Sequence, residues 1–189
     1  MPNYMYNKLQ VSGDQNLIDV MLKDIKNDNP YHDINSIDFN KIIPMPDNII
    51  KGDLSFEDRD NPLTWYNWCV KNWGVQWNAL VNKELLQNIE RGLNTILFIT
   101  AWNPAIPVII ELSRKYNLLS FDYTWISEDI GYHSGRVIIQ NGQIVQTYKF
   151  KGGEARTFEF AANVLNIDLN SDDYELVYNP IENTYTYKD

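Results

Sequence analysis

The chain has 189 residues, enough for one ordinary domain or for one domain with a small appendage. Hydrophobic residues make up 44% and charged residues 22%, a balance typical of globular chains that excludes wholesale disorder. The 25 acidic and 16 basic side chains give a formal charge of −9, whereas a nucleic-acid-binding protein normally carries a basic surplus. We therefore expect no direct contact with DNA or RNA.

Cysteine and histidine are scarce, with Cys69, His32 and His133 the only three. One cysteine cannot build a disulfide or a cysteine-ligated cluster within a chain, and we expect no metal and no other cofactor. The N-terminus lacks the charged and apolar regions of a secretory signal, and the apolar run 95–99 is far shorter than the roughly 20 residues of a membrane span. A free thiol fits a reducing compartment, so we expect a cytoplasmic protein without membrane contact.

The first quarter of the chain predicts a strand, a helix and a second strand. Residues 5–11 alternate between apolar and polar positions, which indicates a half-buried strand. Asp14 is placed to cap a helix over 15–25, whose apolar residues recur at spacings of three and four. An irregular apolar run from Ile34 to Ile43 predicts the second strand.

The middle of the chain predicts an insertion followed by a strand–helix–strand unit. Asn61-Pro62 is typical of a helix start, and Gly92 of the end of a second helix over 84–91. The β-branched and aromatic run 95–100 predicts a buried central strand. Asn103-Pro104 then predicts another helix start, although Pro107 must distort its first turn or shift its cap. The next strand is expected over 118–125.

The last part of the chain predicts a hairpin and a small appendage. Asn141-Gly142 supplies the positive φ angles of a tight turn between strands 136–140 and 144–148. Beyond it, residues 157–165 predict a short helix. Segments 175–178 and 185–187 could pair as two final strands.

This order predicts an α+β ferredoxin-like sandwich with the order β-α-β-β-α-β, an antiparallel sheet and the helices on one face. The ferredoxin-like domain is expected over 1–150, with a helical, tryptophan-rich insertion at 47–92 and an added hairpin. Residues 151–189 are expected to form a C-terminal helix and hairpin appendage.

Common catalytic motifs are missing from the sequence. It has no glycine-rich phosphate loop, no His-Glu-x-x-His and no Gly-x-Ser-x-Gly, so nucleotide-binding, zinc peptidase and serine hydrolase functions have no support. Cys69 and His133 could form a thiolate–imidazole pair. However, the position of Cys69 beside tryptophans on an apolar helix face favours a buried, inert thiol.

Four of the six tryptophans fall within residues 65–77. Tryptophan suits cores and interfaces equally, so two interpretations stay open. The rings could attach the insertion to the sheet. Alternatively they could line a concave site in which Asn72 or Asn78 orients a ligand. The candidate binding residues are Asn72, Trp73, Gly74, Trp77, Asn78, Trp102, Asn103 and Glu128.

Glu128 precedes a glycine turn at the end of a predicted strand. A carboxylate there can act as an acid or base if desolvation raises its pKa, and His133 could assist it. The alternative is a solvated turn, in which Arg136 pairs with Glu128 across the hairpin. The acidic run Asp53–Asp60 and the acidic tail are either solvated faces or mimics of a phosphate backbone.

Several stretches together resemble the YubB-type ferredoxin-like family of phage and plasmid proteins. They are Met1-Pro2-Asn3 with Asn7, Leu9 and Val11, Asn72-Trp73-Gly74 with Trp77, Thr100-Ala101-Trp102 with Pro104, and Glu128 with Gly131 and Gly135. The resemblance implies a ferredoxin-like fold and a mobile-element origin, and brings no established activity. Asn78 stands where that family usually has aspartate, which weakens an enzymatic interpretation or moves the acid–base role to Glu128.

Three functional hypotheses follow. The first is a non-enzymatic phage or plasmid accessory protein that binds a basic surface of a host protein, in its specific form an acidic mimic that inhibits a host nucleic-acid enzyme or defence system. The second is a small-molecule-binding protein or enzyme with Glu128 as acid or base, which requires Trp73, Trp102 and Glu128 to converge. The third is a structural role through pairing of sheet edges, and the sequence leaves the oligomeric state open.

Overall fold

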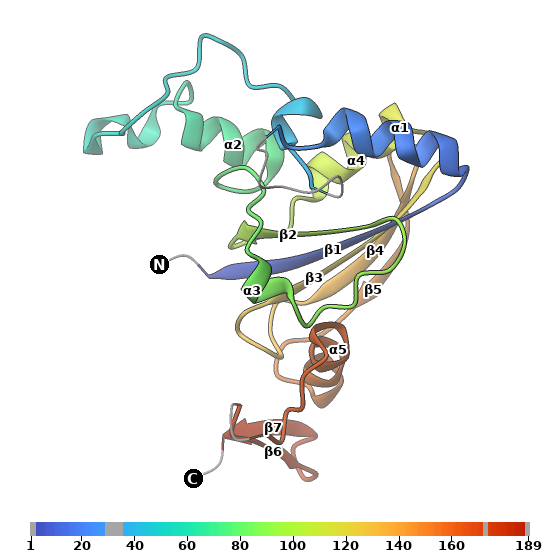
Figure 1. Ribbon diagram of the computed structural model, residues 1–189. Coiled ribbons are helices and arrows are strands. Elements are labelled where there is room, and N and C mark those ends of the chain that lie inside the picture. The colour runs from blue at the N-terminus through green and yellow to red at the C-terminus, as the bar shows by residue number, and fades with distance from the viewer. Residues whose placement is uncertain (1–2, 29–35, 172–173, 188–189) are drawn as a thin grey trace.

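The computed structural model describes residues 3–28, 36–171 and 174–187 (Figure 1). Its elements in chain order are β1 (Tyr4–Ser12), α1 (Gln15–Ile25), η1 (Phe39–Lys41), η2 (Phe56–Asp60), α2 (Trp65–Trp73), α3 (Lys83–Leu86), β2 (Thr95–Ala101), α4 (Ile106–Lys115), β3 (Ser120–Ser127), β4 (Gly135–Gln140), β5 (Gln143–Lys149), α5 (Ala155–Leu165), β6 (Leu176–Asn179) and β7 (Thr184–Tyr187). Mixed helices and antiparallel sheets confirm the α+β class.

The main sheet has the strand order β2-β1-β3-β4-β5, and all neighbouring strands are antiparallel. In a βαββαβ unit the first strand lies between the third and the fourth, and β2 and β3 occupy those two positions beside β1. The helix α4 connects them, as the second helix of such a unit does. The β4–β5 hairpin then extends the sheet beyond the ferredoxin-like core.

Strand β1 shows the alternation that its sequence predicts. Every second residue from Met5 to Val11 is buried on one face, while the residues between them are half-buried on the other. The helices α1 and α4 cover the face of Leu9 and Val11 (Figure 1). The predicted cap of α1 is also confirmed, because the Asp14 side chain accepts a hydrogen bond from the Leu17 N–H at 3.0 Å.

The second strand expected over residues 34–43 is not observed in residues 36–43, the part of it that the structure describes. Ile34 lies outside the described residues, and Phe39–Lys41 form a short 3-10 helix instead. Phe39 is nevertheless fully buried, packed edge-on against Phe98 and Trp73. Among the described residues, the outer edge of β2 pairs only through an isolated antiparallel bridge between Leu80 and Ile99.

The helix start expected at Asn61-Pro62 is displaced to Trp65. The Asn61 side chain accepts a hydrogen bond from the Leu63 N–H and closes a local turn, and Thr64 caps the helix. The following helix is also shorter than residues 84–91, since α3 ends at Leu86. In contrast, the shift that Pro107 demands is observed, with Ala105 as the N-cap residue of α4.

The hairpin prediction is confirmed. Asn141 and Gly142 have φ angles of 46° and 72°, as a primed turn requires. The turn is anchored to the end of α4, because the Gly142 N–H donates to the Ser113 hydroxyl at 2.7 Å.

The opposite face of the sheet is covered by α3, from the middle of the chain, and by α5, from its C-terminal part (Figure 1). Leu97, Ile99 and Ile126 pack there against Leu86 of α3 and Leu165 of α5. The predicted helix at 157–165 is therefore observed, starting at Ala155, and it seals the second face. The predicted final pair of strands is observed as β6 and β7.

Candidate functional site

The tryptophan-rich segment is built into the core on the α1 and α4 face. Trp73 is 4% exposed, packs edge-on against Trp68 and Phe39, and donates its indole N–H to the Ile43 carbonyl at 3.0 Å. Asn72 donates its amide back to the Trp68 carbonyl at 2.8 Å. These contacts favour the interpretation in which the rings attach the insertion to the sheet.

Gly74, Trp77 and Asn78 continue this packing role. Gly74 ends α2 with a φ of 78°, and a Cβ atom there would lie 3.0 Å from Pro107. The Trp77 indole N–H is buried without a hydrogen-bond partner in the described structure. Asn78 accepts from the Phe39 N–H at 2.8 Å and donates to the Asp38 carboxylate at 2.7 Å, so it holds the 3-10 segment in place.

A buried polar network supports the loop that follows β2. The Tyr123 hydroxyl donates to Asn7 Oδ1 at 2.7 Å and accepts from the Ala105 N–H at 2.9 Å. Asn7 in turn donates to the Thr100 hydroxyl at 3.0 Å. Burial raises the pKa of Tyr123 far above its ordinary range, so this hydroxyl keeps its proton and its donor role.

Trp102 is presented to solvent by this loop. It is 42% exposed and has a φ of 64°, a left-handed conformation that is unusual for a bulky residue. The Asn103 carbonyl accepts from the Thr100 hydroxyl at 2.7 Å, and the Trp102 N–H donates to the Asn3 carbonyl at 2.8 Å. Among the six indoles, all within described segments, Trp102 alone is exposed.

Trp102 and Glu128 lie at the same end of the sheet. Because β2 and β3 are both antiparallel to β1, their carboxyl ends meet where β1 begins. The Glu128 N–H donates to the Tyr4 carbonyl at 2.9 Å, and Asn3 donates its amide to the Asp129 carboxylate at 2.5 Å. Asn3 thus links the Trp102 loop to the acidic loop after β3.

The convergence required by the enzymatic hypothesis is not observed. Trp73 packs on the α1 and α4 face, whereas Glu128 is exposed and lines a groove near α5. His133 is an exposed turn residue with a φ of 41°, and Cys69 is buried in the core with burial raising its thiol pKa to about 12. The expected burial of Cys69 is therefore observed, and the exposed His133 does not lie in the core with it.

The predicted pairing of Arg136 with Glu128 is wrong. The Arg136 guanidinium forms a two-point contact with the Asp122 carboxylate, with Nε 2.7 Å from Oδ1, and lies 4.8 Å from the centre of the Tyr148 ring. In the β3–β4 ladder Arg136 lies opposite Thr124, so Asp122 is its diagonal neighbour on β3. In the described part of the chain, no cation lies within ion-pair distance of Glu128.

Glu128 belongs to what we call the acidic groove, two adjoining hollows that share Glu128, Ile130 and Tyr174. The hollow between α3 and α5 has a volume of about 230 Å³, and the one toward Tyr132 about 360 Å³. Glu84 and Asp129 add two further carboxylates. No basic side chain is among the described residues that line either hollow.

Gly131, in the turn after β3, allows close packing beside this groove, because a Cβ atom on it would lie 2.4 Å from the Phe158 ring of α5. The Gly153 N–H also donates to the Gly131 carbonyl at 3.0 Å. The C-terminal segment therefore holds the Glu128 loop in position.

The sequence alone did not reveal the groove. Its walls include Tyr6, Leu165 and Tyr174, which are separated by up to 168 positions. The one signal that could have indicated it is Tyr6 itself, an aromatic residue on the face of β1 opposite to α1. Burial raises the pKa of Tyr6, and the neighbouring Glu128 carboxylate raises it further.

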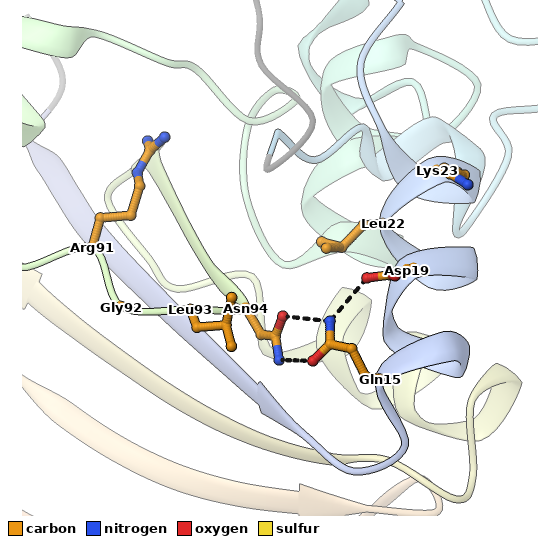
Figure 2. A pocket seen from close by; sticks show the side chains of 8 residues that line it. All are labelled: Gln15, Asp19, Leu22, Lys23, Arg91, Gly92, Leu93 and Asn94. Carbon is orange, nitrogen blue, oxygen red and sulfur yellow. Dashed lines mark hydrogen bonds between the residues drawn. The ribbon is translucent and has the colours of Figure 1, made fainter.

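A larger hollow of about 500 Å³ lies between α1 and the segment leading into β2 (Figure 2). The side chains of Gln15 and Asn94 exchange hydrogen bonds of 3.1 and 2.9 Å across it, and Gln15 also donates to Asp19. Lys23 and Arg91 stand on opposite sides. Since the two amides bond to each other and the charges are mixed, this hollow selects no ligand chemistry.

In the part of the chain that the structure describes, no helix is long and apolar enough to cross a membrane. In residues 3–28, 36–171 and 174–187, no group of three or more His, Cys, Asp or Glu side chains could hold a metal ion.

The strand order and the paired helices define the chain as a ferredoxin-like α+β protein with an acidic groove at one end of its sheet. Residues 76–168 match a family model described as the ferredoxin-like domain in Api92-like protein. The matched segment includes β2 through α5, and so contains most of the groove. No curated protein and no solved structure matches the chain.

Proposed function

We propose that this protein is a non-enzymatic binding module that docks a basic surface of another protein onto its acidic groove. The observation that carries the proposal is the lining of the groove, with three carboxylates, three tyrosines and no basic side chain among its described residues. Tyrosine is enriched where protein interfaces gain their binding energy, and carboxylates without a cationic partner attract a cationic surface.

The surroundings of the groove support the same function. Trp102 and Tyr132, which are 42% and 54% exposed, lie on the loops that follow β2 and β3. Exposed aromatic rings beside carboxylates that no cation neutralises are typical of a recognition surface. The overall charge of −9 would also accelerate the approach of a basic partner.

The more specific form of the proposal concerns origin and partner. The resemblance to YubB-type proteins suggests an accessory protein of a phage or plasmid, which would act in the host cytoplasm. The partner would then be a host protein with a basic surface, such as a nucleic-acid enzyme or a defence system. The carboxylates of this surface would then contact the basic side chains of the partner that normally bind the phosphate backbone.

The first experiment measures binding of a lysine-rich peptide and of an acidic peptide of equal length by titration calorimetry. We expect the basic peptide alone to bind, and its affinity to fall as salt rises from about 50 to about 300 mM, because screening weakens the attraction between exposed charges. Binding that is absent or independent of salt would contradict the proposal.

The second experiment locates the binding surface with two triple variants of equal charge. Glu84→Gln, Glu128→Gln and Asp129→Asn neutralise the groove, whereas Asp47→Asn, Glu90→Gln and Glu182→Gln neutralise exposed carboxylates outside it. We expect the groove variant to lose at least about tenfold in affinity and the control variant to lose much less. Equal losses would show that only net charge matters. Capture from a host lysate with both variants then identifies the partner.

A further inference from the structure

The hollow between α3 and α5 differs in shape and lining from the rest of the acidic groove. Its floor is aliphatic, since the buried Ile89 and Leu165 lie at its base. Its exposed rim carries the carboxylates of Glu84 and Glu128, contributed by α3 and by the loop after β3. An apolar floor below a charged rim fits a ligand that is apolar along its length and cationic at one end.

The size of this hollow limits the ligand further. Its volume of about 230 Å³ is below the roughly 300 Å³ at which pockets for drug-sized molecules begin. It can hold one long side chain with room for water, and it is smaller than the sites that enclose a whole drug-sized molecule. The half-buried rings of Tyr6 and Tyr174 form part of its wall, and aromatic faces attract cations.

The charge of the hollow is unopposed. No cation in the described residues pairs with Glu84 or Glu128, and no basic group lines the hollow. The Glu128 carboxylate also acts on the half-buried Tyr6 hydroxyl, whose pKa is raised mainly by burial and further by this charge. The field of the rim therefore reaches into the partly desolvated interior, where it acts more strongly than at an open surface.

We propose that this hollow is the specificity pocket of the binding module and receives one lysine side chain from the basic partner. The four methylene groups of lysine would lie along Ile89 and Leu165, and its ammonium group would reach Glu84 and Glu128. The two carboxylates come from different elements, and an ammonium group can donate to separate acceptors in several directions. The planar head of arginine instead prefers the two oxygens of one carboxylate. The inference rests on the proposed function, because it assumes a basic protein partner.

The test follows backbone amide signals of the isotope-labelled protein by NMR while capped amino acids are added. Nα-acetyl-lysine N-methylamide is compared with its norleucine, arginine and glutamate counterparts. We expect the lysine compound to shift the amide signals of Ile89, Ile130 and Leu165. The norleucine compound has a similar stem without the charge, and its affinity should be lower by at least about tenfold.

A single substitution in the rim provides the control. Glu128→Gln should weaken lysine binding about tenfold, because it removes a charge-assisted hydrogen bond while leaving an exposed, neutral side chain that does not disturb folding. Glu182→Gln, which changes an exposed carboxylate elsewhere, should have no effect. Equal binding of lysine and norleucine, tighter binding of arginine, or no effect of Glu128→Gln would each overturn the assignment to lysine.

The outcomes separate this inference from the proposed function. If the lysine-rich peptide binds in a salt-dependent manner and needs the groove, but the lysine compound does not enter the hollow, the inference fails and the function stands. If the peptide does not bind at all, the function itself fails.

Discussion

The Phe158 ring lies directly against Gly131, so closely that a Cβ atom on this glycine would stand 2.4 Å from the ring carbons. Phe158 belongs to α5, and Gly131 to the loop that carries Glu128. Their contact therefore joins the C-terminal segment to the end of the main sheet, and the acidic groove lies along this junction.

Gly131→Ala is expected to destabilise the protein, because the new methyl group would overlap the Phe158 ring. Gly52→Ala is the matched control, since Gly52 also has a positive φ but nothing within 4 Å of its Cβ position. We expect Gly131→Ala to lower the free energy of unfolding by about 1–3 kcal/mol more than the control. Denaturant unfolding measures both, and equal losses would show that Phe158 does not pack as described.

Tyr123→Phe should disrupt the loop that presents Trp102. The hydroxyl both donates to Asn7 and accepts from the Ala105 N–H, and its removal leaves two buried polar groups without a partner. The expected loss is about 2–4 kcal/mol of unfolding free energy, since each unpaired buried group costs about 1–3 kcal/mol. Thermal unfolding provides the measurement. Tyr66→Phe, at a 37% exposed residue of α2, should cost little by comparison.

Asn78→Asp is expected to be destabilising at neutral pH, because it places a second carboxylate where the Asn78 amide now donates to Asp38 at 2.7 Å. We expect a loss of about 1–3 kcal/mol. Repulsion would raise the folded-state pKa of one carboxyl, so the lost stability should return as the pH falls toward about 4 and that carboxyl takes up a proton.

Asn82→Asp is the control for this substitution. Asn82 accepts hydrogen bonds from the Glu84 and Leu85 N–H groups at the start of α3, a position where a carboxylate is equally suitable. Its unfolding free energy should change by no more than about 0.5 kcal/mol. A neutral effect of Asn78→Asp across the pH range would contradict the contact with Asp38.

Cys69 should give the protein a specific sensitivity to alkaline pH. Burial raises its thiol pKa from 9.0 to about 12, so the unfolded chain releases this proton first. The contribution to stability is complete below about pH 9 and is lost as the pH rises toward 12, with a limiting slope of about 1.4 kcal/mol per pH unit. Cys69→Ala should lack this part of the slope when both proteins are unfolded with denaturant between about pH 8 and pH 10.

The reactivity of the Cys69 thiol tests its burial independently. In the native protein at about pH 8, the Cys69 thiol should react with a disulfide reagent only at the rate of opening, because both its burial and its protonation oppose attack. Fast labelling without denaturant would show that Cys69 is accessible.

Local patterns in the sequence were sufficient for the elements whose stability is local. The alternation of β1, the Asp14 cap and the Asn141-Gly142 turn each depend on neighbours within a few residues, and each is observed. Pro107 likewise indicated a shifted helix start, because proline constrains its own turn.

In residues 36–43, apolar side chains are buried although the predicted strand is not observed. Ile37 and Phe39, two apolar residues of the predicted strand, are both buried. The sequence pattern could not indicate the 3-10 helix that begins at Phe39, where the N–H donates to Asn78, 39 positions away. A strand also needs a partner, and Leu80 pairs with the edge of β2 instead.

For the tryptophans, composition alone could not predict which rings are buried and which are exposed. Their number indicated a large contribution to either a core or a surface, and only packing decided that Trp73 is enclosed while Trp102 is exposed. The sequence alone determined the class of fold, the acidic character and most of the local turns, because these follow from composition and from contacts between near neighbours. The tertiary structure alone decided where the acidic groove lies, because Tyr6, Glu128 and Leu165 meet only after β1, β3 and α5 have packed together.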